Sequence, residues 1–313
     1  MRVLHGRRSW TLWLLLAITP SASAQSAAPV RQDAGHAVGV RAAGMGGAFT
    51  AVADDGSAAF WNPAGFASGS FFSLVVDANV LDRRRTTLVA LGTPPLGLSY
   101  YRTAIAAEKN GRNTLVAHHA GVTLVQSLGG HLAVGTTIKL VHGIASPDGR
   151  APISTNKFDA DLGFMSTGSL AQVGLSVRNL LQPEFRTSGG GPLRLDRQVR
   201  AGVSIHARQN VTVAGDVDLT TAVSPRGRWR DAALGLEAHP GLKAWLRGGV
   251  HWNAARLRRG ASAGQAGVVT GAAPVGSVGG SYAVYGAVLA DAQVSFGSEN
   301  GDRGWGVALR FVF

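Results

Sequence analysis

The chain has 313 residues, a formal net charge of +12, 43 glycines and no cysteine. With 45% hydrophobic and only 15% charged residues, it is too apolar to be disordered. The glycine content disfavours a mainly helical protein, because each glycine within a helix costs about 0.5–1 kcal/mol relative to alanine. The lack of cysteine excludes disulfides, a lipid-modified cysteine anchor and thiolate metal sites.

The first 24 residues have the pattern of an export signal. Three arginines form a basic region, residues 11–19 form an apolar run, and residues 22–24 read ASA. This order is typical of a cleaved signal peptide, and the apolar run is far shorter than the ~20 residues of a transmembrane helix. We therefore expect cleavage near Ala24, which lowers the formal net charge from +12 to +9.

Residues 25–68 form the next predicted unit, and their sequence favours short helical turns over strands. Asn62 is a favoured N-cap and Pro63 a favoured first helical residue, while Asp54 or Asp55 can cap the turn before them. The two aspartates could also bind a cation, but capping is the stronger interpretation. The residues that we single out in this segment are Gly44, Gly46, Gly47, Asp54, Asp55, Trp61, Asn62, Pro63 and Ala64.

Residues 69–313 alternate between apolar and polar positions with a period of two, which is the signature of β-strands. About fourteen strands are predicted, most of them long enough to cross a bilayer on a tilt. They lie near residues 69–81, 85–93, 96–104, 113–127, 131–143, 156–166, 169–181, 197–208, 210–221, 229–239, 241–252, 264–273, 280–296 and 303–313.

The predicted links between these strands are alternately short and long, with residues 82–85 as a tight exception in a long-link position. A transmembrane barrel sorts its links in this way, with short turns on the periplasmic side and longer loops outside. A soluble β-sandwich has no such asymmetry. The sequence therefore predicts an all-β protein: an antiparallel transmembrane β-barrel of about 14 strands. A barrel also gives residues 25–68 a place to lie, as a short helical hatch in the lumen.

Several charged residues fall opposite the apolar face of their strands, so we assign them to the lumen. A lysine or arginine facing lipid at mid-depth would cost about 2–4 kcal/mol. These charges could form a neutralised, hydrated interior, or they could line a polar conduit or a docking surface for the hatch. The residues are Lys139, Asp159, Asp161, Arg178, Asp216, Asp218, Arg247 and Arg310.

The remaining basic residues gather in the long links, where outer-leaflet lipid phosphates are a simpler partner than nucleic acid. The motifs that resemble catalytic sites lack their structural context. Ser262 lies in a G-x-S-x-G pattern but within a basic, glycine-rich link, and residues 154–157 match S-x-x-K without its companion motifs. His118 and His119 are neighbours on a strand, so they point to opposite faces and cannot share a metal. We expect no enzyme activity, no cofactor and no metal.

The last strand alternates up to an aromatic C-terminus, which resembles the signal that outer-membrane barrels present to the barrel-assembly machinery. Its outward residues include Trp305, Leu309, Phe311 and Phe313.

Residues 41–67 resemble the N-terminal signature of the FadL-like superfamily of outer-membrane proteins, and most closely its PorV/PorQ-type branch. The most specific part is NPA at Asn62, Pro63 and Ala64, preceded by ADD at residues 53–55. The resemblance implies a fourteen-stranded barrel closed by an N-terminal hatch. It also implies transport of small, hydrophobic molecules across the outer membrane of a Gram-negative-type bacterium. The alternative, implied by the PorV/PorQ-type branch, is a barrel of the type IX secretion system that binds or shuttles secreted proteins.

Overall fold

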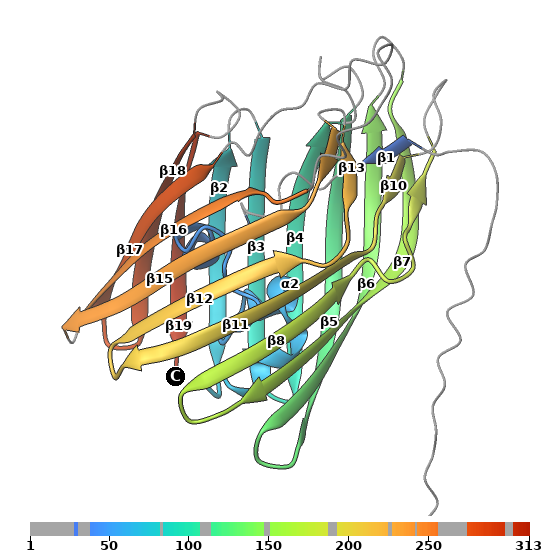
Figure 1. Cartoon of the computed structure of the whole chain (residues 1–313). Coiled ribbons are helices and arrows are strands. Elements are labelled where there is room, and N and C mark those ends of the chain that lie inside the picture. The colour runs from blue at the N-terminus through green and yellow to red at the C-terminus, as the bar shows by residue number, and fades with distance from the viewer. Residues whose placement is uncertain are drawn as a thin grey trace, which may run out of the picture.

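The computed structural model describes residues 28–30, 38–81, 84–106, 114–146, 151–186, 193–224, 227–241, 243–255, 274–297 and 303–313. Within these residues, fourteen antiparallel strands close into a barrel (Figure 1). The barrel strands are β2 (Ser73–Leu81), β3 (Arg84–Thr93), β4 (Leu96–Ala106), β5 (Thr114–Leu128), β6 (Leu132–Ser146), β7 (Ile153–Thr167), β8 (Ala171–Arg178), β11 (Gln198–Arg208), β12 (Val211–Asp218), β15 (Asp231–Gly241), β16 (Ala244–Asn253), β17 (Val275–Tyr285), β18 (Val288–Gly297) and β19 (Gly304–Val312). The fold class predicted from the sequence is therefore confirmed.

The barrel is closed by pairing its last strand with its first. Strand β19 runs antiparallel to β2, with Phe311 opposite Leu74. Beyond the paired strands, the backbones of Phe72 and Phe313 exchange hydrogen bonds of 3.1 and 2.9 Å. Closure leaves no unpaired strand edge in the wall, which satisfies the backbone within a bilayer.

Three short helical elements lie inside the barrel, where Figure 1 shows them in blue behind the front strands. They are α1 (Val40–Gly44), α2 (Ala58–Trp61) and the 3₁₀ helix η2 (Pro63–Ala67). We call residues 38–68, the described part of the predicted hatch segment that contains all three, the hatch. No helix among the described residues is long and apolar enough to cross a bilayer.

Two small sheets lie among the links at the end of the barrel drawn uppermost in Figure 1. The first contains β1 (Ala28–Val30), β10 (Leu193–Leu195) and β9 (Glu184–Phe185), and the second contains β13 (Ala222–Ser224) and β14 (Gly227–Trp229). Links of two or three residues join β3–β4, β5–β6, β7–β8, β11–β12, β15–β16 and β17–β18 at the opposite end. The longer links gather at the upper end, as predicted, and β2–β3 is the tight exception there.

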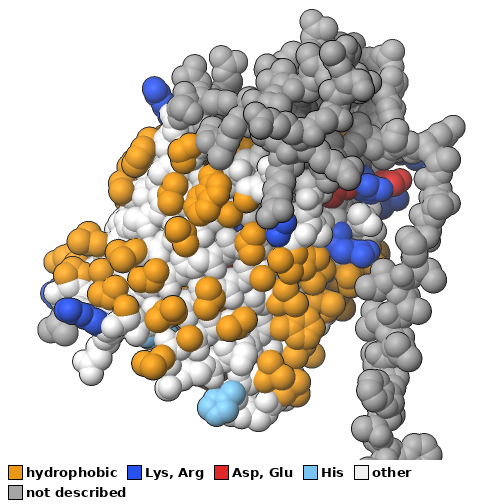
Figure 2. All heavy atoms as spheres, viewed as in Figure 1, with side chains coloured by type: hydrophobic (Ala, Val, Ile, Leu, Met, Phe, Trp, Pro, Cys, Tyr) orange, Lys and Arg blue, Asp and Glu red, His pale blue; other side chains and the backbone are white. Residues whose placement is uncertain are grey.

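The outer face of the barrel is apolar all the way round. Each of the fourteen strands carries at least one exposed large hydrophobic residue, such as Ile138 on β6 and Leu246 on β16. Figure 2 shows such side chains scattered over the face in view. A soluble protein rarely exposes apolar surface on this scale, whereas a membrane-spanning wall requires it.

One strand prediction was wrong. Residues 280–296 were expected to form one strand, but they belong to two strands, β17 and β18. The turn between them contains Gly286, whose φ of +50° is in the left-handed region that favours glycine. The alternation continues through this turn, so its pattern hides the hairpin. The strand expected at 264–273 lies outside the described residues, as does the export signal.

Candidate functional site

The motif Asn62-Pro63-Ala64 fixes the hatch to the barrel wall. The Asn62 side chain accepts a hydrogen bond from the Ala64 N–H at 3.2 Å and so caps η2, with Pro63 at its first position. Its amide nitrogen donates to the carbonyl oxygens of Thr50 within the hatch, at 2.9 Å, and of Phe164 on β7, at 3.1 Å. One fully buried side chain thus caps a helix, folds the hatch on itself and bonds it to the wall.

Glycines of the wall let the hatch backbone come this close. A Cβ at Gly163 would lie 2.2 Å from the Asn62 side-chain oxygen, and one at Gly135 would lie 2.3 Å from the Pro63 carbonyl carbon. Within the hatch, Gly46 and Gly47 have φ of +64° and +80° and end α1, which only glycine does readily. The Gly44 carbonyl accepts a hydrogen bond from the Ser277 hydroxyl at 3.3 Å. The sequence indicated the hatch glycines but not their partners in the wall.

Trp61 lies at the centre of the hatch's apolar core. Its indole N–H donates to the Val38 carbonyl at 2.8 Å, and its ring packs edge-to-face against Phe49 and Phe60. The Arg178 guanidinium lies over Phe60, 4.1 Å from the ring centroid. Arg178 also donates to Gln198 at 2.6 Å and is buried beside the hatch.

Seven charged side chains join the hatch to the wall, and we call this group the latch. Arg41 of α1 holds Glu237 of β15 through two bonds, Nε–Oε2 at 2.8 Å and Nη2–Oε1 at 2.7 Å. Arg41 also pairs with Asp54, and with Asp55 at 3.2 Å. The other members are wall residues: Arg247, which binds Glu237 at 2.5 Å, Arg310, which lies 3.5 Å from Asp55, and Asp291, which binds Arg310.

Asp55 is the buried acid of the hatch in this network. Burial raises the pKa of Asp55, but the charges of Arg41 and Arg310 and two hydrogen bonds from Ser57 outweigh burial and place the pKa below its ordinary value. The Ser57 N–H and hydroxyl donate to one Asp55 oxygen at 2.9 and 2.5 Å, so Asp55 caps the turn before α2. Asp54 makes no such cap and is instead a half-exposed partner of Arg41.

A hollow of about 320 Å³ gives access to the latch. Its lining includes six of the seven latch residues, all but Asp291, together with residues near the short-link end of the barrel such as Trp245 and Val312. The latch is therefore closed by ion pairs that a solute from that end can reach.

A second ionic cluster holds the middle of the hatch. Arg200 on β11 binds Asp216, Asp218 and Asp231 at 2.9–3.0 Å and donates to the Gly47 carbonyl at 2.9 Å. Asp216 accepts the backbone N–H groups of Phe49 and Thr50 at 3.1 and 2.9 Å. These wall charges serve as a docking surface for the hatch, which was one of the two interpretations that the sequence left open.

The third cluster surrounds Lys139 on β6, which is buried. Its ammonium lies 2.8 Å from Asp161 and 3.2 Å from Asp159, and donates to Asn179 at 3.1 Å. His119 packs beside it, stacked on Tyr101, while His118 points to the opposite face of the strand, as predicted. Among the described residues its ion pairs and hydrogen bonds stay within the wall, so it corresponds to the neutralised interior that was the other interpretation.

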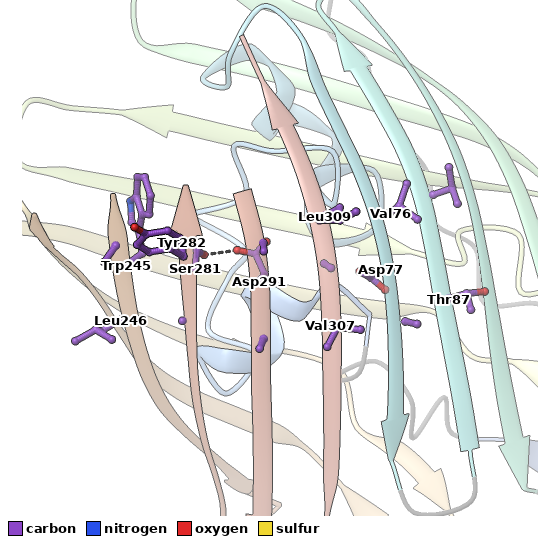
Figure 3. A pocket seen from close by; sticks show the side chains of 17 residues that line it. Val76, Asp77, Thr87, Trp245, Leu246, Ser281, Tyr282, Asp291, Val307 and Leu309 are labelled. Atoms are coloured by element: carbon purple, nitrogen blue, oxygen red, sulfur yellow. Dashed lines mark hydrogen bonds between the residues drawn. The ribbon is translucent and has the colours of Figure 1, made fainter. Parts of the chain in front are cut away.

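An apolar hollow of about 960 Å³ lies on the wall formed by β16–β19, β2 and β3 (Figure 3). Exposed side chains such as Leu246, Tyr282 and Leu309 rim it. The inward side chains of the same strands include Ser281, which donates to the latch residue Asp291, drawn as a dashed line in Figure 3. A single layer of strands thus separates the latch from the lipid-facing surface.

Sequence reasoning missed Arg41, Arg200, Asp231, Glu237 and Asp291. Arg200, Asp231 and Asp291 are charged residues at inward positions of strands, so the alternation that indicated the other lumen charges could have found them. The C-terminal residues Trp305, Leu309 and Phe313 are exposed on the outer face. Their role as an assembly signal stays a prediction. Ser262 lies outside the described residues, and residues 154–157 lie in β7.

Comparison with known proteins finds similar structures but no similar sequences. No protein-family model matches the chain, and no curated protein matches it in sequence. The CymD monoaromatic hydrocarbon channel superposes with a TM-score of 0.63 at 15% identity, covering 88% of this chain and 97% of that one. The fold is shared. It is also shared with the toluene transporter TbuX of Ralstonia pickettii, with a TM-score of 0.59, 14% identity and coverage of 88% and 98%. A FadL homologue from Pseudomonas aeruginosa superposes with a TM-score of 0.56 at 9% identity, covering 85% of this chain and 96% of that one.

Proposed function

We propose that this protein is an outer-membrane channel for small hydrophobic molecules, closed by its hatch and opened when the latch releases. The observation that carries the proposal is the latch itself: Arg41 and Asp55 hold the hatch to Glu237 and Arg310 through ion pairs next to a hollow that solutes can enter. Ion pairs can exchange for water or for another partner, whereas the apolar packing of Trp61 cannot.

The membrane location is supported by the outer face. Exposed hydrophobic residues on every barrel strand match a lipid surface, and the closed strand pairing satisfies the backbone there. The predicted export signal agrees with an outer membrane reached after cleavage near Ala24.

The class of transported molecule is supported by the shared fold. Two of the compared structures are a monoaromatic hydrocarbon channel and a toluene transporter, and a third is a FadL homologue. Monoaromatic hydrocarbons are therefore the first class to test, and long-chain fatty acids the second.

Uptake by whole cells tests this proposal. Cells that express the protein should accumulate labelled toluene faster than cells with an empty vector, while a labelled hydrophilic solute of similar size, such as glycerol, should enter both at the same rate. The proposal would be contradicted if expressing cells and empty-vector cells took up toluene at the same rate and also took up a labelled fatty acid at the same rate. Heat-modified migration on gels must first show that the barrel is folded.

The alternative, a PorV/PorQ-type barrel serving type IX secretion, rests on the resemblance of residues 41–67 alone. Its test is co-purification of secretion components from native membranes. Contacts of link arginines with lipid phosphates, and of the C-terminal strand with the assembly machinery, are further partners that we propose.

A further inference from the structure

The long-link end of the lumen contains an apolar patch that differs from the rest of the inner wall. It is formed by four buried, inward-facing residues at the ends of β5 and β6: Leu115, Ala117, Val141 and Ala145. Further along the same two strands, the inward positions hold His119, Thr123, Thr137 and Lys139. The patch also forms a cluster separate from the apolar core of the hatch.

The benzyl ring of Phe185 covers this patch. Phe185 belongs to β9, in the long link between β8 and β11, and only 1% of its surface is exposed. Its ring lies so close to Gly143 of β6 that a Cβ at this glycine would be 2.3 Å from a ring carbon. Leu193 and Leu195 of the neighbouring β10 complete the contact. The ring that fills this patch therefore comes from a link and not from the barrel wall.

We propose that this patch is a binding site for one small apolar molecule the size of a benzene ring. In the closed protein the Phe185 ring fills this site and competes with the ligand for it. The inference rests on the proposed function for its choice of ligand class. It goes further by naming the site and an internal competitor.

The dimensions and chemistry of the site support this choice. Removing the benzyl ring would leave a cavity lined by aliphatic side chains, and an apolar cavity of about 150 Å³ in a protein stays free of water and binds benzene. The buried charges of Lys139 and Asp161 lie next along the same wall, so the patch would accept an unsubstituted ring and exclude a longer chain.

Binding of fluorobenzene to the purified full-length protein, followed by ¹⁹F NMR in a fixed detergent, tests the inference. Phe185→Ala should show a saturable site with a dissociation constant at least tenfold below that of the wild type. Phe185→Leu, which leaves a smaller space, should show an intermediate gain. Adding Ala117→Leu to Phe185→Ala should fill the space and remove the gain.

Phe158→Ala is the matched control, because it removes the same ring from the lipid-facing side of β7. It should bind like the wild type, and an equal gain there would overturn the inference. So would the absence of a saturable site in folded Phe185→Ala and Phe185→Leu. Because binding is measured without transport, failure of toluene uptake in cells would count against the proposed function and leave this site standing.

Discussion

Arg41 and Glu237 are 196 residues apart in the sequence and form a two-bond ion pair of 2.8 and 2.7 Å between the hatch and the wall. Planar pairing of a guanidinium with a carboxylate fixes both distance and orientation. Because Arg41 also binds Asp54 and Asp55, this one side chain connects the start of the hatch, its acidic turn and strand β15. Loss of Arg41 should therefore release the hatch more than loss of any single acid.

Arg41→Gln should weaken the closed state. Glu237 keeps its pair with Arg247, and Asp55 keeps its pair with Arg310. The closed state should therefore lose about 3 kcal/mol of stability, the lower end of the range for breaking a buried ion pair. The conductance of the protein in planar bilayers should rise. Arg194→Gln is the control, because its pair with Asp196 is partly exposed and neither residue belongs to the hatch or the latch, and it should leave the conductance unchanged. Equal conductance of Arg41→Gln and the wild type would show that the latch does not hold the hatch.

Protonation of Asp55 should weaken the latch only at low pH. The folded-state pKa of Asp55 lies below its unfolded value of about 3.9, so its contribution to the closed state is complete above that value and is lost as the pH falls through the folded pKa. The part of the conductance that depends on Asp55, taken as the difference between the wild type and Asp55→Asn, should stay constant from pH 7 to 5 and change below about pH 4. Asp55→Asn should conduct more at pH 7 and respond less to acid. An acid response as large in Asp55→Asn as in the wild type would rule out this carboxylate.

Gly163→Ala should push the Asn62-Pro63 motif away from the wall, because its Cβ would lie 2.2 Å from the Asn62 oxygen. The barrel should still form, while the hatch becomes sensitive to added protease in detergent. Gly248→Ala is the matched control, since a Cβ there meets nothing within 4 Å. The same protease resistance in both variants would mean that the close approach is not needed to seat the hatch.

Deletion of residues 25–65 should raise the conductance in planar bilayers, because this removes most of what fills the lumen between the Arg200 cluster and the latch. Unboiled and boiled samples of the variant should still migrate differently on gels, which shows that the barrel is folded. A folded variant with wild-type conductance would show that the segment does not occlude the lumen.

The strands were largely predictable because the wall repeats one rule, apolar outward and small or polar inward. By that rule Lys139 and Asp159 are assigned to the inner face of the wall, and both are buried in the structure. It failed at Gly286, where the alternation on β17 and β18 runs on through a two-residue link. A turn that needs one left-handed residue is hard to see in a chain with 43 glycines.

The partners of the site residues were not predictable, because they depend on which strands face one another across the lumen. Nothing local in the sequence joins Arg41 to Glu237, or Asp216 to the N–H groups of Phe49 and Thr50. Helix caps are different, since Asn62 and Pro63 act within their own turn. Nothing in the sequence indicated that Phe185 contacts the wall, because this contact depends on how a long link folds.

The central claim is that the hatch gates the passage of hydrophobic molecules, and a reversible lock tests it most directly. A Cβ at Gly44 would lie 3.4 Å from the Gly279 Cα, and one at Gly279 would lie 3.2 Å from the Gly44 Cα, so cysteines at both positions are within disulfide range in a chain with no other cysteine. Uptake of labelled toluene by cells expressing Gly44→Cys/Gly279→Cys should fall to the empty-vector rate when the pair is oxidised and recover on reduction. Uptake at the same rate in both states, with the disulfide verified, would contradict the claim.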